Sequence, residues 1–453
     1  MINAAQIPAD SFNRFLVLTP LLSEVERICN ATTCVQPLEN KRKHTSKLYA
    51  LKQLIISGEN ICCTHTLCEL FDSEVKDLLQ NGDYHYILII DEEPTVIVDT
   101  IDIQQPKGNA KAANKNIQEV YKLNKQDYKM LRERGFLLID EYTGRLYWND
   151  ELEYNNAGRR GVFEGVRKTF NKLDLYSFNN DERVIAVVNP SIWLCFDEIY
   201  ISTYRLHNSP FDYYCQLYGF NIEYYHINSS GEISAGFVPA YPKGLERLVV
   251  CDDEKYNLTG KKYSLSLRWF ENNCKKNSPA ASELHNALRG FLRYGIPKGE
   301  LTGYYWTTFK AFKGCLTGKE VSPKRWIAHN TRATNDYSNC NAVAFVCDKF
   351  PNPNLYNFLK SKGIIFDKNE YALSCLIQFV WRSSIRTACA NKVYVYIPAK
   401  RLRLHFKAWL STGIGTQKID TQKGKIKGAG FSLTLSKGTV CLHSELFSKE
   451  IEL

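Results

Sequence analysis

The chain has 453 residues and a formal net charge of +10, and 44% of its residues are hydrophobic while 23% are charged. These values are ordinary for a folded protein with its own core, and the length predicts about two or three domains. No apolar run approaches the roughly 18 residues needed to cross a bilayer, and the first residues lack the basic and apolar regions of a secretory signal. We therefore expect a cytoplasmic protein that does not bind a membrane.

Fifteen cysteines are scattered along the chain. Because no secretion signal precedes them, we interpret them as reduced thiols of the core. One cluster, Cys62, Cys63, His65 and Cys68, contains groups that zinc accepts as ligands. A paired Cys-x-x-Cys motif elsewhere in the chain is missing, so we interpret this segment as a buried strand that continues into a helix.

Apolar, β-branched runs alternate with helical patterns in the first half of the chain. Short buried strands are predicted at 14–20, 60–65 and 84–93, and helices are predicted after Ser23 and over 73–82. This alternation, with strands that are apolar throughout, is typical of a parallel α/β sheet.

Residues 103–180 interrupt the pattern with Lys- and Asn-rich stretches, and we interpret them as an insertion with helical parts. Two apolar strand-like runs return within 183–204, and a linker-like break falls near residue 240. A second α/β pattern then extends over 245–412. Its predicted helices are 282–295 and 371–386, and its predicted strands are 303–309, 325–330, 341–347 and 392–398.

The last part of the chain is basic. Between residues 392 and 437 there are ten Lys or Arg residues and one acid, Asp420, which gives 10 − 1 = +9. Residues 413–453 begin with a Gly-, Thr- and Lys-rich stretch that predicts a flexible tail with a short strand-forming end. The stretch 392–437, which we call the basic strip, is either a solvated, poorly ordered segment or a surface that contacts nucleic-acid phosphates, with aromatic rings available for stacking. The rings are Phe406, Trp409 and Phe431.

The strand predicted at 84–93 ends in the acids Asp91, Glu92 and Glu93. Ligands of parallel α/β sheets bind outside the carboxyl ends of the strands. Asp91 can hold Mg²⁺ through its water shell, and Glu92 can orient and deprotonate an attacking water. A solvated strand end is the alternative interpretation.

Gln378, Arg382 and Arg386 are spaced four residues apart on a predicted helix. This spacing places all three on one helix face. Two arginines on one face suit triphosphate oxygens, because each guanidinium can bind phosphate with two hydrogen bonds and stabilise transition-state charge. A surface helix with salt bridges is the alternative.

Seven strings in chain order resemble motifs of the phage-encoded branch of the superfamily 2 helicases, the DEAD/DEAH-like enzymes with two RecA-like domains. They resemble motifs Ia, Ib, II, III, IV, V and VI and read FLVLTPLLSEVERI, NICCTHTLCELF, IIDEEP, YISTY, YYWTTFK, NTRATNDY and QFVWRSSIR. The resemblance covers roughly residues 10–412. It implies a first RecA-like domain over 1–240 that contains the insertion, a second over 241–412, and the basic tail.

Carried over by position, the resemblance implies ATP and Mg²⁺ as cofactors, with Asp91 and Glu92 as the metal and water residues. Gln378, Arg382 and Arg386 would then sense ATP across an interdomain cleft. The family spaces the final arginine one residue closer to the glutamine, so either Arg382 or Arg386 is the candidate arginine finger. The residues implied to contact nucleic acid, mainly at its backbone, are Thr19, Pro20, Thr64, His65, Arg332, Thr334 and Asn335.

The sequence departs from the family at the phosphate-binding loop. Such a loop needs G-x-x-x-x-G-K-[ST], and the Gly-Lys pairs at 260–261 and 318–319 are followed by neither Ser nor Thr. In the family this loop and its helix precede motif Ia, and MINAAQIPADS resembles the remainder of that helix. We therefore expect the first domain to lack its P-loop strand, as in a chain that begins at an internal methionine.

These observations favour a fragment of an ATP-dependent DNA helicase from a phage or prophage replication module in a bacterial host cell. We expect it to bind single-stranded or duplex nucleic acid, with phage replication proteins as partners, and not to hydrolyse ATP by itself. The alternative is a non-enzymatic nucleic-acid-binding protein that retains the helicase fold. A metal-dependent nuclease or phosphoesterase that uses Asp91 and Glu92 is a third hypothesis, for which further acid and His motifs are missing.

Overall fold

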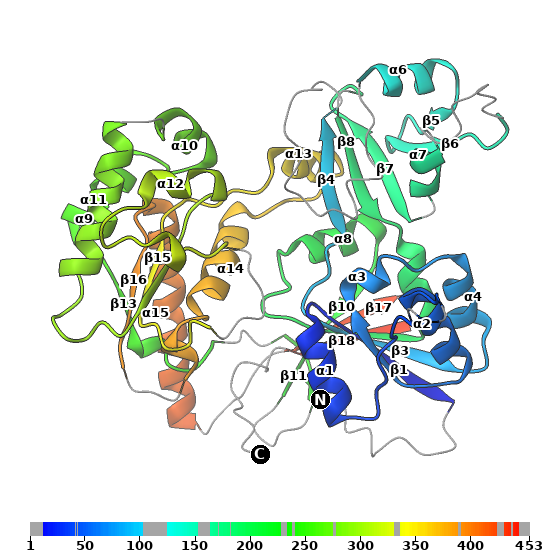
Figure 1. The fold of residues 1–453 in the computed structure, drawn as a ribbon, viewed down its shortest axis with the longest axis horizontal. Helices are drawn as coiled ribbons and strands as arrows, with labels where there is room; N and C mark the ends of the chain where they lie inside the picture. Colours follow the sequence, from blue (N-terminus) through cyan, green and yellow to red (C-terminus); the bar gives the residue numbers. More distant parts are fainter. Residues whose placement is uncertain are drawn as a thin grey trace.

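The protein is an α/β protein with two mainly parallel sheets and a separate antiparallel sheet. Figure 1 shows the C-terminal α/β part apart from the N-terminal sheet, with the antiparallel sheet next to the latter. The expected α/β class with two parallel sheets is confirmed. The computed structural model describes residues 12–40, 42, 44–102, 125–152, 164–170, 172–181, 183–227, 233–237, 241–274, 278–329, 336–387, 391–423, 430–435 and 438–443.

The N-terminal sheet is built on four parallel strands in the order β2–β1–β3–β9. Their central residues, such as Leu16, Leu88, Ile90 and Ile201, are fully buried, as expected for strands covered on both faces. The strands are β1 (Asn13–Thr19), β2 (Ile61–Thr64), β3 (His85–Asp91) and β9 (Glu198–Ser202). The helices of this part are α1 (Leu22–Ala31), α2 (Lys47–Ile56), α3 (His65–Cys68), α4 (Ser73–Asn81) and α8 (Pro210–Tyr218).

Three further strands extend this sheet beyond β9. β18 (Gly438–His443) runs parallel to β9, β17 (Gly430–Leu435) runs antiparallel to β18, and β10 (Asn221–Glu223) forms the edge. The expectation of a flexible tail from residue 413 is therefore wrong over much of its length, because α15 (Lys400–Lys423) continues through the Gly-rich stretch. The strand-forming end is confirmed, and it covers the edge of β9. A small hairpin pairs β11 (Tyr225–Ile227) with β12 (Ile233–Ala235).

The insertion is mainly an antiparallel sheet, in the order β4–β8–β7–β6–β5, and we call it the inserted sheet. The expected bounds of 103–180 were too narrow, and helices are the smaller part of it. The run RVIAVV, the first of the two strand-like runs predicted within 183–204, forms β8 and pairs antiparallel with β7 of the insertion. The elements are β4 (Ile97–Asp102), α6 (Lys125–Glu133), β5 (Leu137–Ile139), β6 (Arg145–Trp148), α7 (Glu164–Thr169), β7 (Leu173–Phe178) and β8 (Arg183–Val188).

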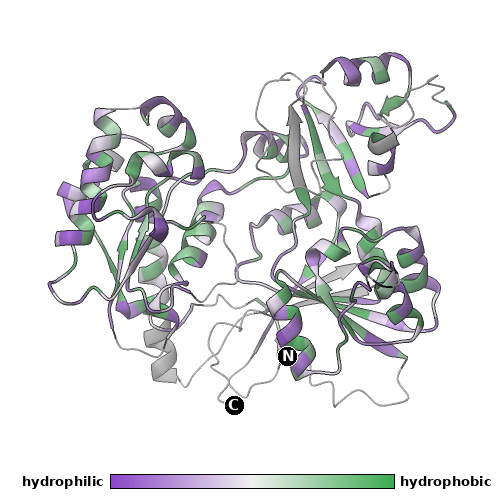
Figure 2. Cartoon of the chain, viewed as in Figure 1, coloured by the Kyte–Doolittle hydropathy of each residue, from purple (hydrophilic) through white to green (hydrophobic). Residues whose placement is uncertain are grey.

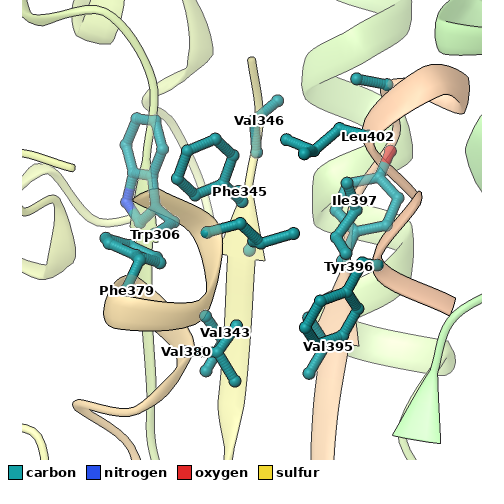
Figure 3. Close-up of a cluster of buried hydrophobic side chains, with 14 of the residues drawn as sticks. Trp306, Val343, Phe345, Val346, Phe379, Val380, Val395, Tyr396, Ile397 and Leu402 are labelled. Atoms are coloured by element: carbon teal, nitrogen blue, oxygen red, sulfur yellow. The ribbon is translucent and has the colours of Figure 1, made fainter. Parts of the chain in front are cut away.

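The C-terminal sheet has four parallel strands in the order β13–β16–β15–β14. Its core packs α14 and α15 against the strands through residues such as Trp306, Phe345, Phe379 and Tyr396 (Figure 3). The strands are β13 (Leu248–Val250), β14 (Tyr304–Thr307), β15 (Ala342–Phe345) and β16 (Val393–Tyr396). The helices are α9 (Glu254–Lys262), α10 (Leu267–Asn273), α11 (Pro279–Tyr294), α12 (Lys313–Leu316) and α14 (Lys368–Val380), followed by α15.

One helix crosses from the C-terminal part to the N-terminal core. α13 (Pro353–Ser361) follows β15, and its Phe358 and Leu359 are buried in the N-terminal cluster rather than in their own. The ring of Phe358 lies 5.4 Å from Tyr176 and 5.8 Å from Phe178, both on β7. α13 therefore ties the C-terminal part to the inserted sheet, next to which Figure 1 draws it.

The distribution of hydropathy follows these layers. In Figure 2 hydrophobic residues concentrate along the strands, and hydrophilic residues concentrate on the outer sides of the helices. Among the described residues, no helix is long and apolar enough to span a bilayer.

Candidate functional site at the domain boundary

The acidic strand end lies where the direction of the N-terminal sheet reverses. From β1 the chain leads outward to β2, then crosses back so that β3 lies on the other side of β1. Such a switch point leaves a crevice outside the carboxyl ends of the two strands, which is the usual ligand site of an open α/β sheet. The ends that meet here are Thr19 of β1 and Asp91 of β3.

Glu92 is held by an unusual backbone. Its φ is +62°, in the left-handed region that few residues with a side chain adopt, and its N–H donates to the carbonyl of Ser202 at 2.7 Å. Such conformations concentrate at functional sites. Burial raises the pKa of the neighbouring Asp91 to about 6, with added repulsion from Glu92 and Glu24. The strand end is therefore a partly buried pair of acids.

The predicted helix face with Gln378, Arg382 and Arg386 is wrong. α14 ends at Val380, and Arg382 and Arg386 follow in a turn and in a short 3-10 helix, η6 (Ser384–Arg386). The physical reason is Ser383, whose hydroxyl donates to the carbonyl of Val380 at 2.7 Å and accepts from the N–H of Ile385. Serine side chains compete in this way with helix continuation. Gln378 stays half-buried on α14.

The structure nevertheless brings both arginines to Glu92. Burial lowers the pKa of the Arg382 guanidinium, while Tyr305 and Glu92 act to raise it. Burial also lowers the pKa of Arg386, and the same two groups act to raise it. Glu92 of the N-terminal sheet therefore interacts electrostatically with Arg382 and Arg386 of the C-terminal part. We name the region around these three residues the interdomain cleft, after the cleft that the helicase resemblance implies.

Arg382 has an unused donor. Only 6% of the residue is exposed, its guanidinium lies 5.7 Å from the ring centre of Phe379, and its Nη1 has no hydrogen-bond partner among the described residues. A buried donor without a partner costs about 1–3 kcal/mol, more when charged. An anion that binds in the cleft would remove this cost.

The pair formed by His329 and Lys349 was not predicted from the sequence. Nζ of Lys349 lies 2.8 Å from Nε2 of His329. Burial, together with Lys349 and Arg382, lowers the pKa of His329 to about 4, so the ring is neutral and accepts from the lysine. Both positions had a usable signal, because His329 directly precedes the string NTRATNDY and Lys349 follows the strand predicted at 341–347.

Polar contacts hold the two sides of the cleft together. Arg205, which follows β9, forms an ion pair with Glu370 of α14, and Nε2 of His405 lies 3.2 Å from the same carboxylate. The N–H of Asp367 donates to the hydroxyl of Tyr213 at 2.8 Å. Direct polar contacts therefore join the start of α14 to the N-terminal part.

The predicted nucleic-acid contacts are spread over different environments. Thr19 is fully buried, and its hydroxyl donates to the carbonyl of Leu21 at 3.0 Å. Pro20, Thr64 and His65 are partly exposed, and His65 lines a cavity beside α3. The role of all these residues in binding stays a prediction. Three further candidates lie outside the described residues, namely Arg332, Thr334 and Asn335.

The interpretation of the basic strip as a stacking surface is wrong where the structure describes its side chains. Phe406 and Trp409 are buried in the C-terminal core. Arg401 forms an ion pair with Asp348 at 2.5 Å, and Lys407 forms one with Asp252. The reason is that the start of α15 packs one face on the sheet and pairs its cations with acids that follow the strands. Phe431 lies in β17, and its side chain is outside the described residues.

Comparison with known proteins shows the family to which the chain belongs. A family described as the YonV C-terminal Rossmann-like domain matches residues 243–410, the span of the C-terminal sheet. The SPbeta prophage-derived uncharacterized protein YonV of Bacillus subtilis (strain 168) is 30% identical over 410 residues, which cover 87% of this chain and 92% of that protein. No solved structure matches. The chain belongs to the family of this prophage-derived protein, YonV.

Proposed function

We propose that the chain is a helicase-like protein that binds nucleic acid and receives the phosphates of an Mg²⁺-bound nucleoside triphosphate in its interdomain cleft. The proposal rests on two observations: Glu92, just after β3, interacts electrostatically with Arg382 and Arg386 after α14, and Nη1 of Arg382 is buried without a hydrogen-bond partner among the described residues. A carboxylate and two guanidinium groups from different domains suit phosphoryl chemistry, in which catalysis is positioning and charge stabilisation. The seven helicase-like strings in chain order add support.

Each cleft residue has a role in this proposal. Asp91 would hold Mg²⁺ through its water shell, as a single carboxylate beside phosphate commonly does. Glu92 would orient a water and accept its proton. Arg382 and Arg386 would donate to the terminal phosphate, and the unused Nη1 of Arg382 is such a donor.

The residues fit only part of such a ligand. Among the described residues no group of three or more His, Cys, Asp or Glu could hold a metal alone, so phosphate and water would complete the coordination. The sequence has no G-x-x-x-x-G-K-[ST] loop to surround the inner phosphates. We therefore propose that this chain by itself binds, and does not turn over, the triphosphate.

The biological setting is also a proposal. The related protein is named for the SPbeta prophage. We propose that this chain works in a phage or prophage replication module, with DNA as its nucleic acid and phage replication proteins as partners. The net charge of +10 suits a polyanionic partner.

The test measures whether Mg·ATP bound in the cleft changes the affinity of the chain for nucleic acid. A labelled single-stranded oligodeoxythymidylate would be titrated with the full chain by fluorescence anisotropy, with and without Mg·ATP. Because coupling between two sites is reciprocal, Mg·ATP should change the affinity for the strand. Arg386→Ala should remove the change, whereas Arg268→Ala, an exposed arginine on α10, should keep it.

Two outcomes would contradict the proposal. One is a full chain that does not bind the strand at all. The other is a strand affinity that is the same with and without Mg·ATP, which would leave a non-enzymatic nucleic-acid-binding protein as the better description. ATP turnover by the chain alone should stay at background.

A further inference from the structure

A cavity is lined by residues of both the N-terminal part and the inserted sheet. Its volume is about 230 Å³. One wall comes from the N-terminal part, through Leu18 of β1, His65 of α3 and Pro94 just after β3. The opposite wall comes from the insertion and the segment after it, through Leu173 of β7 and Val188 of β8. The cavity therefore lies next to the carboxyl ends of β1 and β3.

The walls are mostly apolar and partly aromatic. Phe71, Ile192 and Trp193 line the interior and are themselves buried. The indole N–H of Trp193 donates to the hydroxyl of Tyr214 at 2.8 Å, which fixes the ring. An apolar cavity of roughly 150 Å³ in another protein accepts a benzene ring. The cavity here is larger and can hold a planar ring system.

Positive charge gathers at the same cavity. Lys168 and Lys172, both exposed, and Lys76, which is half-buried, are among its lining residues. Among the described lining residues, Glu69 is the one acid. Burial raises the pKa of its carboxyl, and Lys172 opposes the rise. Three lysines against one acid favour an anionic ligand, and the apolar interior favours a ring.

A ring joined to phosphates is a nucleotide unit of a polynucleotide. We propose that this cavity receives one unstacked base of a bound single strand, while Lys168 and Lys172 contact the flanking phosphates. The proposal rests on the proposed function, since it names how the strand is held. In this proposal the insertion takes part in binding the strand, because it supplies Lys168, Lys172 and one cavity wall.

The geometry suits a strand that lies across the N-terminal part. His65, predicted to contact the nucleic-acid backbone, lines the cavity. Base insertion between apolar and aromatic side chains is tolerant of sequence, because every base has a π face. The lysines would add affinity that falls with salt. We therefore expect little sequence preference and a strong salt dependence.

The test uses the full chain and oligodeoxythymidylate with one central 2-aminopurine, whose emission rises when the base leaves its stack. Thr95, an exposed lining residue, would be changed to Trp to fill the cavity. Thr95→Trp should lower affinity about tenfold and remove the rise in emission. Ser282→Trp, on the exposed side of α11, is the control and should do neither.

A second variant tests the phosphate contacts without touching the interior. Lys168→Ala with Lys172→Ala should reduce the log-log salt slope by about two, one for each lost contact. Lys129→Ala, an exposed lysine on α6 of the same insertion, should leave the slope unchanged. Both lysines of the pair are exposed, so the fold should persist, and circular dichroism would verify this.

The outcomes separate the two proposals. If the full chain binds the strand but emission stays flat and the Thr95→Trp and double-lysine variants bind like the unchanged protein, the cavity proposal is overturned and the proposed function stands. If the full chain does not bind the strand, both are overturned. A rise in emission that only Thr95→Trp removes, together with a lower salt slope in the lysine pair, supports the cavity as a base site.

Discussion

Replacing His329 by glutamine should change how the stability of the protein depends on pH. The pKa of His329 is lowered from 6.5 to about 4, first by burial and then by Lys349 and Arg382. The unfolded chain therefore takes up a proton near pH 6.5, and the folded protein takes it up only near pH 4. Protonation favours the unfolded state, so this part of the stability is complete above pH 6.5 and is lost as the pH falls towards 4.

The size of the effect follows from the same values. A pKa difference of one corresponds to about 1.4 kcal/mol, so the full loss is about 3 kcal/mol, and about 2 kcal/mol is lost by pH 5. Glutamine keeps an oxygen that can accept from Lys349 but does not titrate. The difference in the free energy of unfolding between the unchanged protein and His329→Gln should therefore shrink by about 2 kcal/mol between pH 7 and pH 5.

Urea unfolding at the two pH values, followed by tryptophan fluorescence, measures this difference. The comparison between proteins is needed because Asp91, whose pKa is raised to about 6, stabilises the folded state as the pH falls and partly masks the histidine. His44→Gln, at an exposed histidine, is the control. Parallel curves for the unchanged protein and His329→Gln would refute the assignment of a buried, neutral His329 beside Lys349.

Two further predictions concern the packing that positions the cleft. Phe358→Ala should lower the free energy of unfolding by about 3–5 kcal/mol, because this fully buried ring of α13 fills the N-terminal core. Urea unfolding would measure the loss, and a loss under about 1 kcal/mol would contradict the docking of α13. Arg401→Ala leaves the carboxylate of Asp348, only 2% exposed, without its ion pair, and should cost about 3–5 kcal/mol at pH 7. Arg401→Ala with Asp348→Asn should recover part of this loss, and a double variant no more stable than the single one would argue against the pair.

The strands of the N-terminal sheet could be predicted because their signal is local. The predicted runs 14–20, 60–65 and 84–93 became β1, β2 and β3 with small changes at the ends. Continuous Val, Ile and Leu runs between turn residues leave few other structures. The position of Asp91 and Glu92 at the carboxyl end of β3 follows from the same local pattern.

Other features depend on partners that are distant in sequence. The run RVIAVV of β8 is apolar like a parallel strand, and its antiparallel pairing with β7 cannot be inferred from its composition. The burial of Phe358 in another domain depends on a docking surface formed by β7 and β8. Counting charges likewise identified Arg401 and Lys407 as basic, but their acid partners lie 53 and 155 residues away.

The candidate site was predicted correctly in part and wrongly in part. Spacing alone assigned Gln378, Arg382 and Arg386 to one helix face, and the hydroxyl of Ser383 ended the helix before either arginine. Arg382 and Arg386 still interact electrostatically with Glu92, although neither lies on α14.

The central claim is that the cleft between Glu92 and the two arginines binds phosphate. Isothermal titration calorimetry of Mg·ATP into the full chain tests it most directly, with Arg386→Ala, Glu92→Gln and the control Arg268→Ala measured in parallel. Loss of a charge-assisted contact should weaken binding about tenfold or more in Arg386→Ala, while Glu92→Gln and Arg268→Ala bind as well as the unchanged protein. No detectable binding by the unchanged protein, or equal binding by Arg386→Ala, would contradict the account.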